Sequence, residues 1–242
     1  MYESLSLSQN RKTCFYPAHK NTFAIMHGLP EEGGTCPGAT MGPGGCLAKI
    51  KGRVTCYTEK THRLYPKYSE MVKRNTELLR DKSENELVII LRNTVMKFLL
   101  NGGYKAQYFR IHMEGDFFSQ DYTKAWARVI QEWPTVRFWV YTRSFWAVPL
   151  LVDCKNLSIY LSCDPQNIEN ARTWLDIYGK NTNVGMAWMG DSVPDGLPKT
   201  VVCPELSGKV KNTKDHGACS KCRLCMIHTE TIKLRNIQFP LH

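Results

Sequence analysis

The sequence lacks the features of membrane and secreted proteins. No stretch reaches the roughly 18 consecutive apolar residues that a membrane-spanning helix needs. The first twelve residues, MYESLSLSQNRK, contain no apolar core of a secretory signal. We therefore expect no membrane partner and a cytoplasmic protein.

Internal repeats, low-complexity tracts, clear linkers and blocks of five or six like charges are also missing. The 242 residues, 43% of them hydrophobic and 11% aromatic, suit a folded globular protein. We expect a single domain over 1–242, with an α/β part in 1–200 and a cysteine-rich extension in 201–242. The net charge of +10 is compatible with a nucleic-acid partner, but the basic residues are dispersed, so charge alone does not decide this.

Cysteine, by contrast, is abundant, with ten residues. A cytoplasmic chain of this length does not need disulfides, so this number favours metal or redox chemistry. One candidate ligand set lies near the C-terminus and comprises Cys203, Cys219, Cys222 and Cys225. The other lies in the glycine-rich loop 33–57 and comprises Cys36, Cys46 and Cys56. We expect the chain between the two sets to bring them to one end of the fold.

The identity of the metal is left between two alternatives, because zinc and iron–sulfur clusters both accept four thiolates. Three cysteines at successive third positions are more typical of ferredoxin-type ligation than of a zinc ribbon, so we favour iron–sulfur, with zinc as the alternative. Either the C-terminal set alone binds metal, or each set holds a [4Fe-4S] cluster. In the second case the three-cysteine set leaves one iron open to a substrate or cofactor.

Between the two sets, the sequence predicts regular alternation of strands and helices. Helices are expected at 66–81 and 84–100, the second starting with a capping box at Ser83 and Glu86. Strands are expected at 22–26, 108–113, 136–141, 157–162, 183–189 and 200–202. Further helices are expected at 119–133, 145–152 and 165–178. This order predicts parallel strands with helices outside, curled into a (β/α) barrel or part-barrel.

Polar residues follow the apolar bodies of these strands, where parallel barrels carry their working groups. Arg110, His112 and Glu114 alternate, so they are expected to share the face that points into the barrel. Together with Asp116 and Arg143 they are the candidate catalytic residues. For Glu114 and Asp116 the alternative is helix capping and loop solvation.

The order of motifs resembles one known family. Thr-Cys-Pro-Gly, Arg-Ile-His-Met-Glu-Gly-Asp-Phe, Phe-Trp-Val-Tyr-Thr-Arg-Ser and Cys-x-x-Cys-x-x-Cys follow one another between Thr35 and Cys225. This order is similar to that of the phage "gene product 88" family of uncharacterised proteins. The resemblance implies a phage-encoded protein of the host cytoplasm, and it supplies no activity.

A more distant likeness is to radical S-adenosylmethionine (SAM) enzymes, which carry a three-cysteine loop after the first strand of a parallel part-barrel. This likeness implies a [4Fe-4S] cluster on Cys36, Cys46 and Cys56, with SAM bound beside it. Nine residues separate each pair of these cysteines, whereas the radical SAM pattern is C-x3-C-x2-C. The same likeness implies six cofactor-binding residues, namely Gly115, Asp116, Thr142, Ser144, Ser162 and Asp164.

Three classes of function therefore stay open. The first is an iron–sulfur enzyme of radical-SAM-like type with an unknown substrate. The second is a nucleic-acid-binding protein whose metal only stabilises the fold, and the third is a phage factor that binds a host protein.

Overall fold

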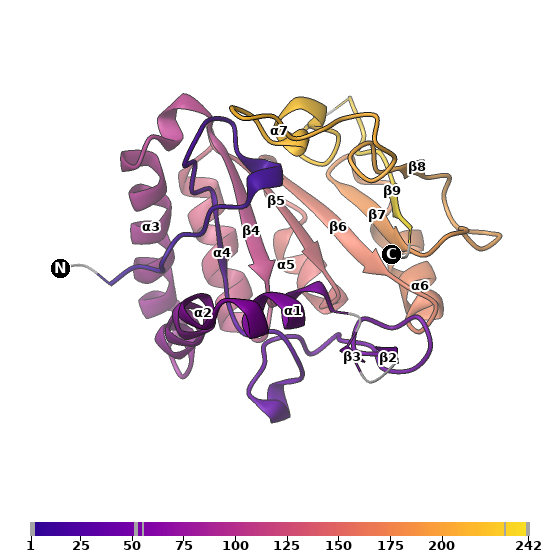
Figure 1. Ribbon diagram of the computed structural model, residues 1–242, viewed down its shortest axis with the longest axis horizontal. Helices are drawn as coiled ribbons and strands as arrows, with labels where there is room; N and C mark the ends of the chain where they lie inside the picture. The colour runs from indigo at the N-terminus through magenta and orange to yellow at the C-terminus, as the bar shows by residue number, and fades with distance from the viewer. Residues whose placement is uncertain (1–2, 51–52, 55, 230, 241–242) are drawn as a thin grey trace.

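The protein is built on one seven-stranded sheet in which every pair of neighbouring strands is parallel (Figure 1). The computed structural model describes residues 3–50, 53–54, 56–229 and 231–240. From one edge to the other, the strands are β1 (Thr22–Ala24), β4 (Tyr108–Glu114), β5 (Arg137–Thr142), β6 (Leu157–Cys163), β7 (Val184–Met189), β9 (Ile237–Phe239) and β8 (Val201–Val202).

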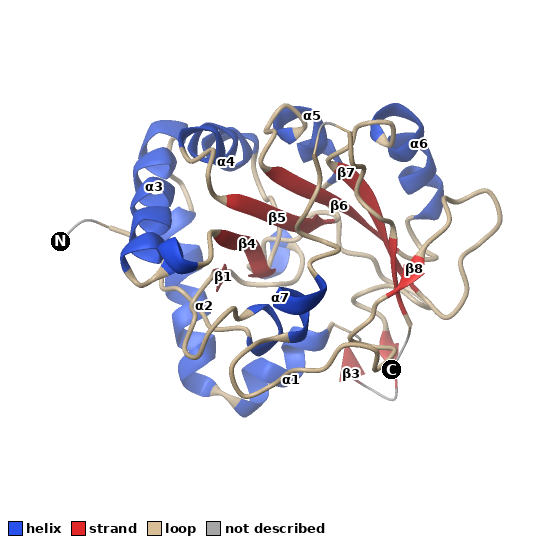
Figure 2. Ribbon diagram, turned by 90° about the horizontal axis from the view of Figure 1, so that it is seen from above, coloured by secondary structure: helices blue, strands red, loops and turns tan. Residues whose placement is uncertain are grey.

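Helices cover both faces of this sheet, as Figure 2 shows. One face carries α3 (Glu84–Leu100), α4 (Gln120–Glu132), α5 (Val148–Leu151) and α6 (Ile168–Tyr178). The opposite face carries α1 (Tyr57–Leu64), α2 (Pro66–Leu79) and α7 (Ala218–Cys222). A two-stranded hairpin of β2 (Lys49–Ile50) and β3 (Arg53–Val54) lies near the ends to which the strand arrows point in Figure 1.

The main core lies between the sheet and the layer of α3 and α4. Trp126 of α4 is fully buried and packs on Phe109 and Phe138 of the neighbouring strands. The expected capping box at the start of α3 is present, with the Ser83 amide donating to the Glu86 carboxylate at 2.9 Å. These helices form because a capped, amphipathic segment can bury one face against the sheet.

The predicted parallel α/β class is confirmed, and each predicted strand matches an observed one to within a few residues. The sheet was also expected to curl into a barrel or a part-barrel, and of these two the closed barrel does not form in the described part of the chain. Among the described residues the sheet is open, with β1 at one edge and β8 at the other. No described helix is long and apolar enough to cross a membrane.

The expected alternation along β4 is also wrong at one position. The register between β1 and β4 shifts between Thr22 and Ala24, and His112 has a positive φ of 58°. This irregularity is a bulge, which re-aims side chains within a strand. His112 consequently contacts Tyr122 of α4, at 2.8 Å, and does not share a face with Arg110 and Glu114.

The C-terminal segment covers the sheet face that α3–α6 leave open. Tyr160, Ala187, Leu234 and Ile237 form a small buried cluster there, which Cys225 and Leu224 also contact. In Figure 1 α7 lies at the end where the strands begin, opposite the hairpin β2–β3. The two cysteine sets therefore do not lie at one end of the fold, contrary to the expectation.

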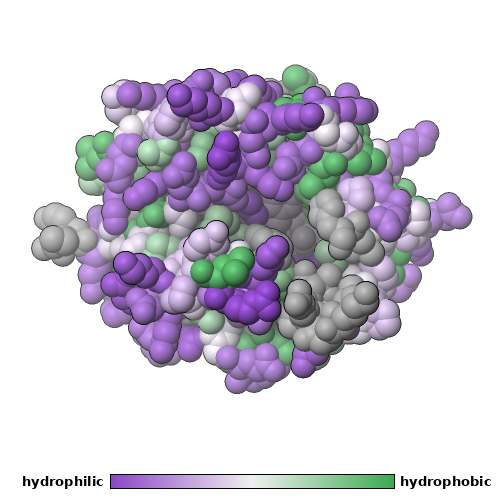
Figure 3. Space-filling view, viewed as in Figure 1, coloured by the Kyte–Doolittle hydropathy of each residue, from purple (hydrophilic) through white to green (hydrophobic). Residues whose placement is uncertain are grey.

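The surface facing the viewer is mainly hydrophilic, with apolar patches scattered over it (Figure 3).

Candidate metal centres on the two halves of the open face

The four C-terminal cysteines surround one cavity. Its volume is about 50 Å³, several times the ~10–15 Å³ that a water molecule needs. Its lining includes all four of these thiols, together with Arg110 and Tyr141. The chain thus gathers four soft ligands around one space that is larger than a water site.

Local geometry explains how these thiols converge. Cys219 and Cys222 stand three residues apart on α7, so they share one face of that helix. Arg223 follows with a φ of 56° and its amide donates to the Cys219 carbonyl, so the chain turns back there and carries Cys225 to the sheet. Cys203 arrives separately after β8, where its amide donates to Gln238 of β9.

The electrostatics of these thiols show that they are close neighbours. Burial raises the pKa of Cys225 to about 12; the charges of the other three cysteines contribute to this rise, and a hydrogen bond with Tyr141 opposes it. Burial likewise raises the pKa of Cys219 to about 11, an effect that the nearby Arg110 guanidinium partly offsets. Without a metal, four ionised thiols at this site would repel one another and lose hydration, so the charged form needs a cation.

Arg110 is placed beside this cavity and not at the strand ends where it was expected to act. Its guanidinium lies 5.4 Å from the ring centroid of Tyr141, and that ring stacks on Tyr160 at 5.2 Å. The Tyr141 hydroxyl lies against the Cys225 thiol. The cavity is bordered by two arginines, Arg110 and Arg223, by Glu205, and by the rings of Trp139 and Tyr141.

The glycine-rich loop lies across the opposite ends of the strands. Gly38 passes so close to the end of β5 that a Cβ atom there would stand 2.1 Å from the Arg143 carbonyl oxygen. Farther along, the Pro43 carbonyl accepts a hydrogen bond from Gln166 after β6, at 2.7 Å. Residues 51, 52 and 55 of this loop lie outside the described residues. The loop spans the carboxyl ends of the sheet, where parallel folds hold their ligands.

The three cysteines of this loop are near one another. Burial raises the pKa of Cys36 well above its usual value, and the charges of Asp116, Cys56 and Cys46 raise it further. The Cys46 sulfur accepts a hydrogen bond from the Thr40 amide at 3.3 Å. Hydrogen bonds from amides stabilise a thiolate, so the surroundings of Cys46 suit a thiolate ligand.

Cys14, Cys154 and Cys163 belong to neither set, and all three are buried. None of the ten cysteines forms a disulfide.

Asp116 is enclosed by hydrogen bonds from the protein. Its carboxylate accepts from the Thr142 hydroxyl at 2.6 Å and from the amides of Phe117, Arg143 and Ser144. Burial raises its pKa, and these donors offset part of that effect. Gly115 precedes it with a φ of 84°, in contact with Ile25, so only glycine fits there. Both residues shape the junction between β4 and β5.

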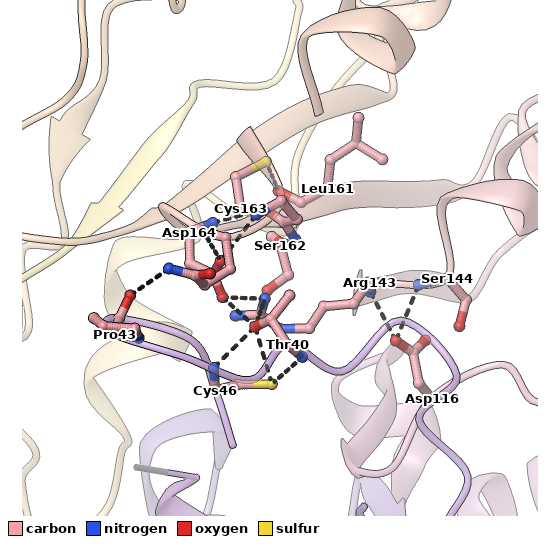
Figure 4. A network of polar contacts seen from close by, with 12 residues as sticks. Thr40, Pro43, Cys46, Asp116, Arg143, Ser144, Leu161, Ser162, Cys163 and Asp164 are labelled. Carbon is pink, nitrogen blue, oxygen red and sulfur yellow. Dashed lines mark hydrogen bonds and ion pairs between the residues drawn. The ribbon is translucent and has the colours of Figure 1, made fainter. Parts of the chain in front are cut away.

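Arg143, Asp164 and Thr40 form a second polar network at the strand ends (Figure 4). One Asp164 oxygen accepts from the Arg143 guanidinium at 2.5 Å and from the Thr40 hydroxyl at 2.6 Å. The other accepts from the amides of Gln166 and Asn167. Asp164 therefore holds Arg143 beside Cys46, and both of its carboxylate oxygens are engaged in hydrogen bonds within the protein.

The other predicted cofactor-binding residues have mixed surroundings. The Ser144 hydroxyl donates to the Phe117 carbonyl, and the Thr142 hydroxyl is engaged by Asp116. Ser162 is half-buried at the end of β6. His112, expected to be catalytic, is buried against α4, and burial lowers its pKa to about 3. The structure thus separates His112 from the strand-end groups and leaves Arg143 among them.

Sequence reasoning missed one group of side chains at this end. Glu114 meets His27, His62 and Tyr68, with the His27 Nδ1 atom 2.6 Å from a Glu114 oxygen. His27 follows β1, and His62 and Tyr68 belong to α1 and α2, which no strand pattern could pair with β4. In the sequence, His27 and His62 flank the cysteine loop. This placement was the one sequence feature that could have suggested that they lie close together.

The spacing between candidate ligand atoms distinguishes the histidine–glutamate group from the two cysteine sets. Among the described residues, one group of three or more Cys, His, Asp or Glu ligand atoms lies within 4.8 Å of one another, namely His27, His62 and Glu114. Neither cysteine set is that compact. In a tetrahedral zinc site, Zn–S bonds of about 2.3 Å place the sulfur atoms about 3.8 Å apart.

The fold defines the class first: a mixed α/β protein on an open parallel sheet, with one cysteine set over a sheet face and the other at the carboxyl ends of the strands. Comparison with known sequences then gives the family. The profile described as "Gene product 88" matches residues 4–227, so the chain belongs to this phage protein family.

Two relatives show how far the similarity extends. The Gene 88 protein of Mycobacterium phage D29 is 37% identical over 240 residues, covering 92% of this chain and 94% of that protein. The Gene 88 protein of Mycobacterium phage L5 is 35% identical over 208 residues, covering 82% of this chain and 81% of that protein. No solved structure matches the chain.

Proposed function

We propose that the protein is an iron–sulfur protein in which the four C-terminal cysteines hold a fully ligated [4Fe-4S] cluster. The observation that carries this proposal is the single cavity lined by Cys203, Cys219, Cys222 and Cys225. Arg110 at its border supplies positive charge to a site that four thiolates make strongly negative. All four ligands come from protein, so this cluster stabilises the fold or relays electrons.

The lack of a compact trio of thiols among the described residues supports iron–sulfur over zinc at this site. A zinc ion binds all four sulfur atoms itself, whereas each thiolate of a [4Fe-4S] cluster binds a different iron, so the sulfur atoms stand farther apart. No three thiols among the described residues approach within 4.8 Å. In a zinc tetrathiolate the sulfur atoms all lie within that distance of one another.

We further propose that Cys36, Cys46 and Cys56 hold a second cluster with one open iron. Three protein thiols leave one coordination position free, and the loop lies at the carboxyl ends of a parallel sheet. Arg143, whose side chain is 12% exposed, is held beside Cys46 and faces this region. An open iron supplies one-electron chemistry, which makes the protein an enzyme of radical-SAM-like type if SAM is its co-substrate.

Within that enzyme, the roles of the chain's own residues differ from the radical SAM expectation. Asp116 and Asp164 both use their carboxylates to position loops and Arg143. Arg143 is then the residue available to pair with a carboxylate of a bound amino acid, because guanidinium and carboxylate groups match in geometry.

The test is an EPR spectrum of the dithionite-reduced protein, recorded anaerobically with and without SAM, together with chromatography for 5′-deoxyadenosine and methionine. We expect SAM to change the cluster signal in the wild type and in Cys14→Ser, a buried thiol outside both sets. Cys36→Ala should abolish the change. If SAM never changed the cluster signal, the proposal of a second, open cluster would fail. The C-terminal cluster would then stabilise a protein that binds nucleic acid or a host protein. Zinc in place of iron would contradict the whole proposal.

A further inference from the structure

We infer that His27, His62 and Glu114 form a separate site for one divalent transition-metal ion. Their ligand atoms lie within 4.8 Å of one another, and both histidines direct a ring nitrogen at the same Glu114 oxygen. Two imidazoles and one carboxylate on one side of an ion are the ligand set of mononuclear iron(II) sites with open positions. This inference goes beyond the iron–sulfur proposal and does not depend on it.

The site is built from three separate elements that tertiary structure brings together. Glu114 ends β4, and its side chain is completely buried. His62 comes from α1, and His27 from the segment after β1; their side chains are 14% exposed or less. A buried carboxylate needs partners that neutralise its charge, and a metal ion held by all three residues would do so.

The outer nitrogens of both histidines carry the partners expected behind metal ligands. His62 Nδ1 lies 2.8 Å from the Ser69 hydroxyl, and His27 Nε2 lies 3.4 Å from the Glu59 carboxylate. Such outer partners fix the tautomer of a ligating histidine and orient its ring. The Tyr68 hydroxyl donates to the remaining Glu114 oxygen at 2.8 Å, so that carboxylate is oriented too.

The probe is Mn(II), a hard ion that prefers oxygen and nitrogen ligands over thiolates. Binding to the full-length, cluster-containing protein is followed by the EPR amplitude of the free ion. We expect one Mn(II) per chain, roughly 100-fold weaker binding in His62→Gln and His27→Gln, and roughly 10-fold weaker binding in Glu59→Gln. The exposed His216→Gln is the matched control and should bind as the wild type does.

Both histidine variants alter partly exposed side chains, so they should fold, and circular dichroism checks this. Cys46→Ser should bind Mn(II) normally, which separates this site from the iron–sulfur proposal. Absence of Mn(II) binding, or equal binding by wild type and His62→Gln, would overturn the inference. In that event His27 carries a second proton and the trio is a hydrogen-bonded ion pair.

Discussion

The two cysteine sets, which we propose as cluster ligands, lie in different structural settings. Three of the four C-terminal thiols lie within seven residues around a short helix, and a local turn suffices to gather them. The loop thiols are ten residues apart in sequence and meet because the ends of β4, β5 and β6 hold the loop in place. A compact local set suits a stabilising cluster, whereas a set assembled by the sheet ends lies where a parallel fold binds ligands.

The largest effect should separate the two sets by stability. We expect Cys222→Ser to lose the closed cluster and, with it, about 10 kcal/mol of folding free energy, which is as much as a whole domain has. The variant should therefore lack a cooperative thermal transition in calorimetry. Cys46→Ser should keep that transition within a few degrees of the wild type, and Cys14→Ser should behave like the wild type. Equal loss of stability in Cys222→Ser and Cys46→Ser would remove the distinction between the sets.

The second prediction concerns the scaffold beneath the loop cysteines. Asp116→Asn replaces a carboxylate oxygen by an amide that cannot accept from all four donors. We expect a loss of about 2–4 kcal/mol in urea unfolding, because buried donors lose their partner. The iron content should stay unchanged. Asp121→Asn, at an exposed position in the first turn of α4, should change the unfolding free energy very little.

A smaller effect should appear at the C-terminal cluster when its charge partner is removed. Arg110→Gln takes a positive charge from the border of the cavity. For a charge roughly 8 Å away in a medium of effective dielectric about 20, this costs the reduced cluster about 2 kcal/mol, or on the order of 90 mV. Redox titration should therefore give a lower potential for Arg110→Gln and a nearly unchanged one for Arg110→Lys. If neither variant moved the potential, Arg110 would not be a partner of the cluster.

The smallest effect concerns the pH dependence of the unfolding free energy, through a histidine that belongs to neither cysteine set. Burial lowers the pKa of His19 to about 4, so the folded protein keeps this imidazole neutral. The stabilisation is complete above the unfolded pKa of about 6.5 and is lost as the pH falls toward 4. Between pH 7.5 and 5.5 the wild type should lose about 1.3 kcal/mol through His19. Urea titrations of His19→Gln should lack this part of the pH dependence; an unchanged dependence would mean that His19 is not held neutral.

Much of the fold could be predicted from the sequence because its signals are local. The capping box at Ser83 and the alternation of apolar strands with helices between 108 and 189 gave the parallel sheet. The final strand β9 was missed because three residues carry little periodicity, and its place between β7 and β8 depends on tertiary contacts. The choice between a closed barrel and a part-barrel stayed open because alternation predicts parallel pairing and does not say whether the edge strands meet.

The candidate sites divide in the same way. Cysteine spacing grouped the four C-terminal cysteines, and all four line one cavity in the structure. The bulge at His112 could not be read from the sequence, so strict alternation placed that histidine on the wrong face. Likewise, His27 and His62 approach Glu114 only because α1 and the segment after β1 pack at the same end of β4.

The central claim is that two cysteine sets hold two clusters with different roles. Quantitation of iron and sulfide per chain, in anaerobically purified wild type and in the triple variant Cys36→Ala, Cys46→Ala, Cys56→Ala, tests it most directly. The account predicts about eight irons in the wild type and about four in a variant that is still folded. Four irons in both proteins would contradict the second cluster, and zinc in place of iron would contradict the account as a whole.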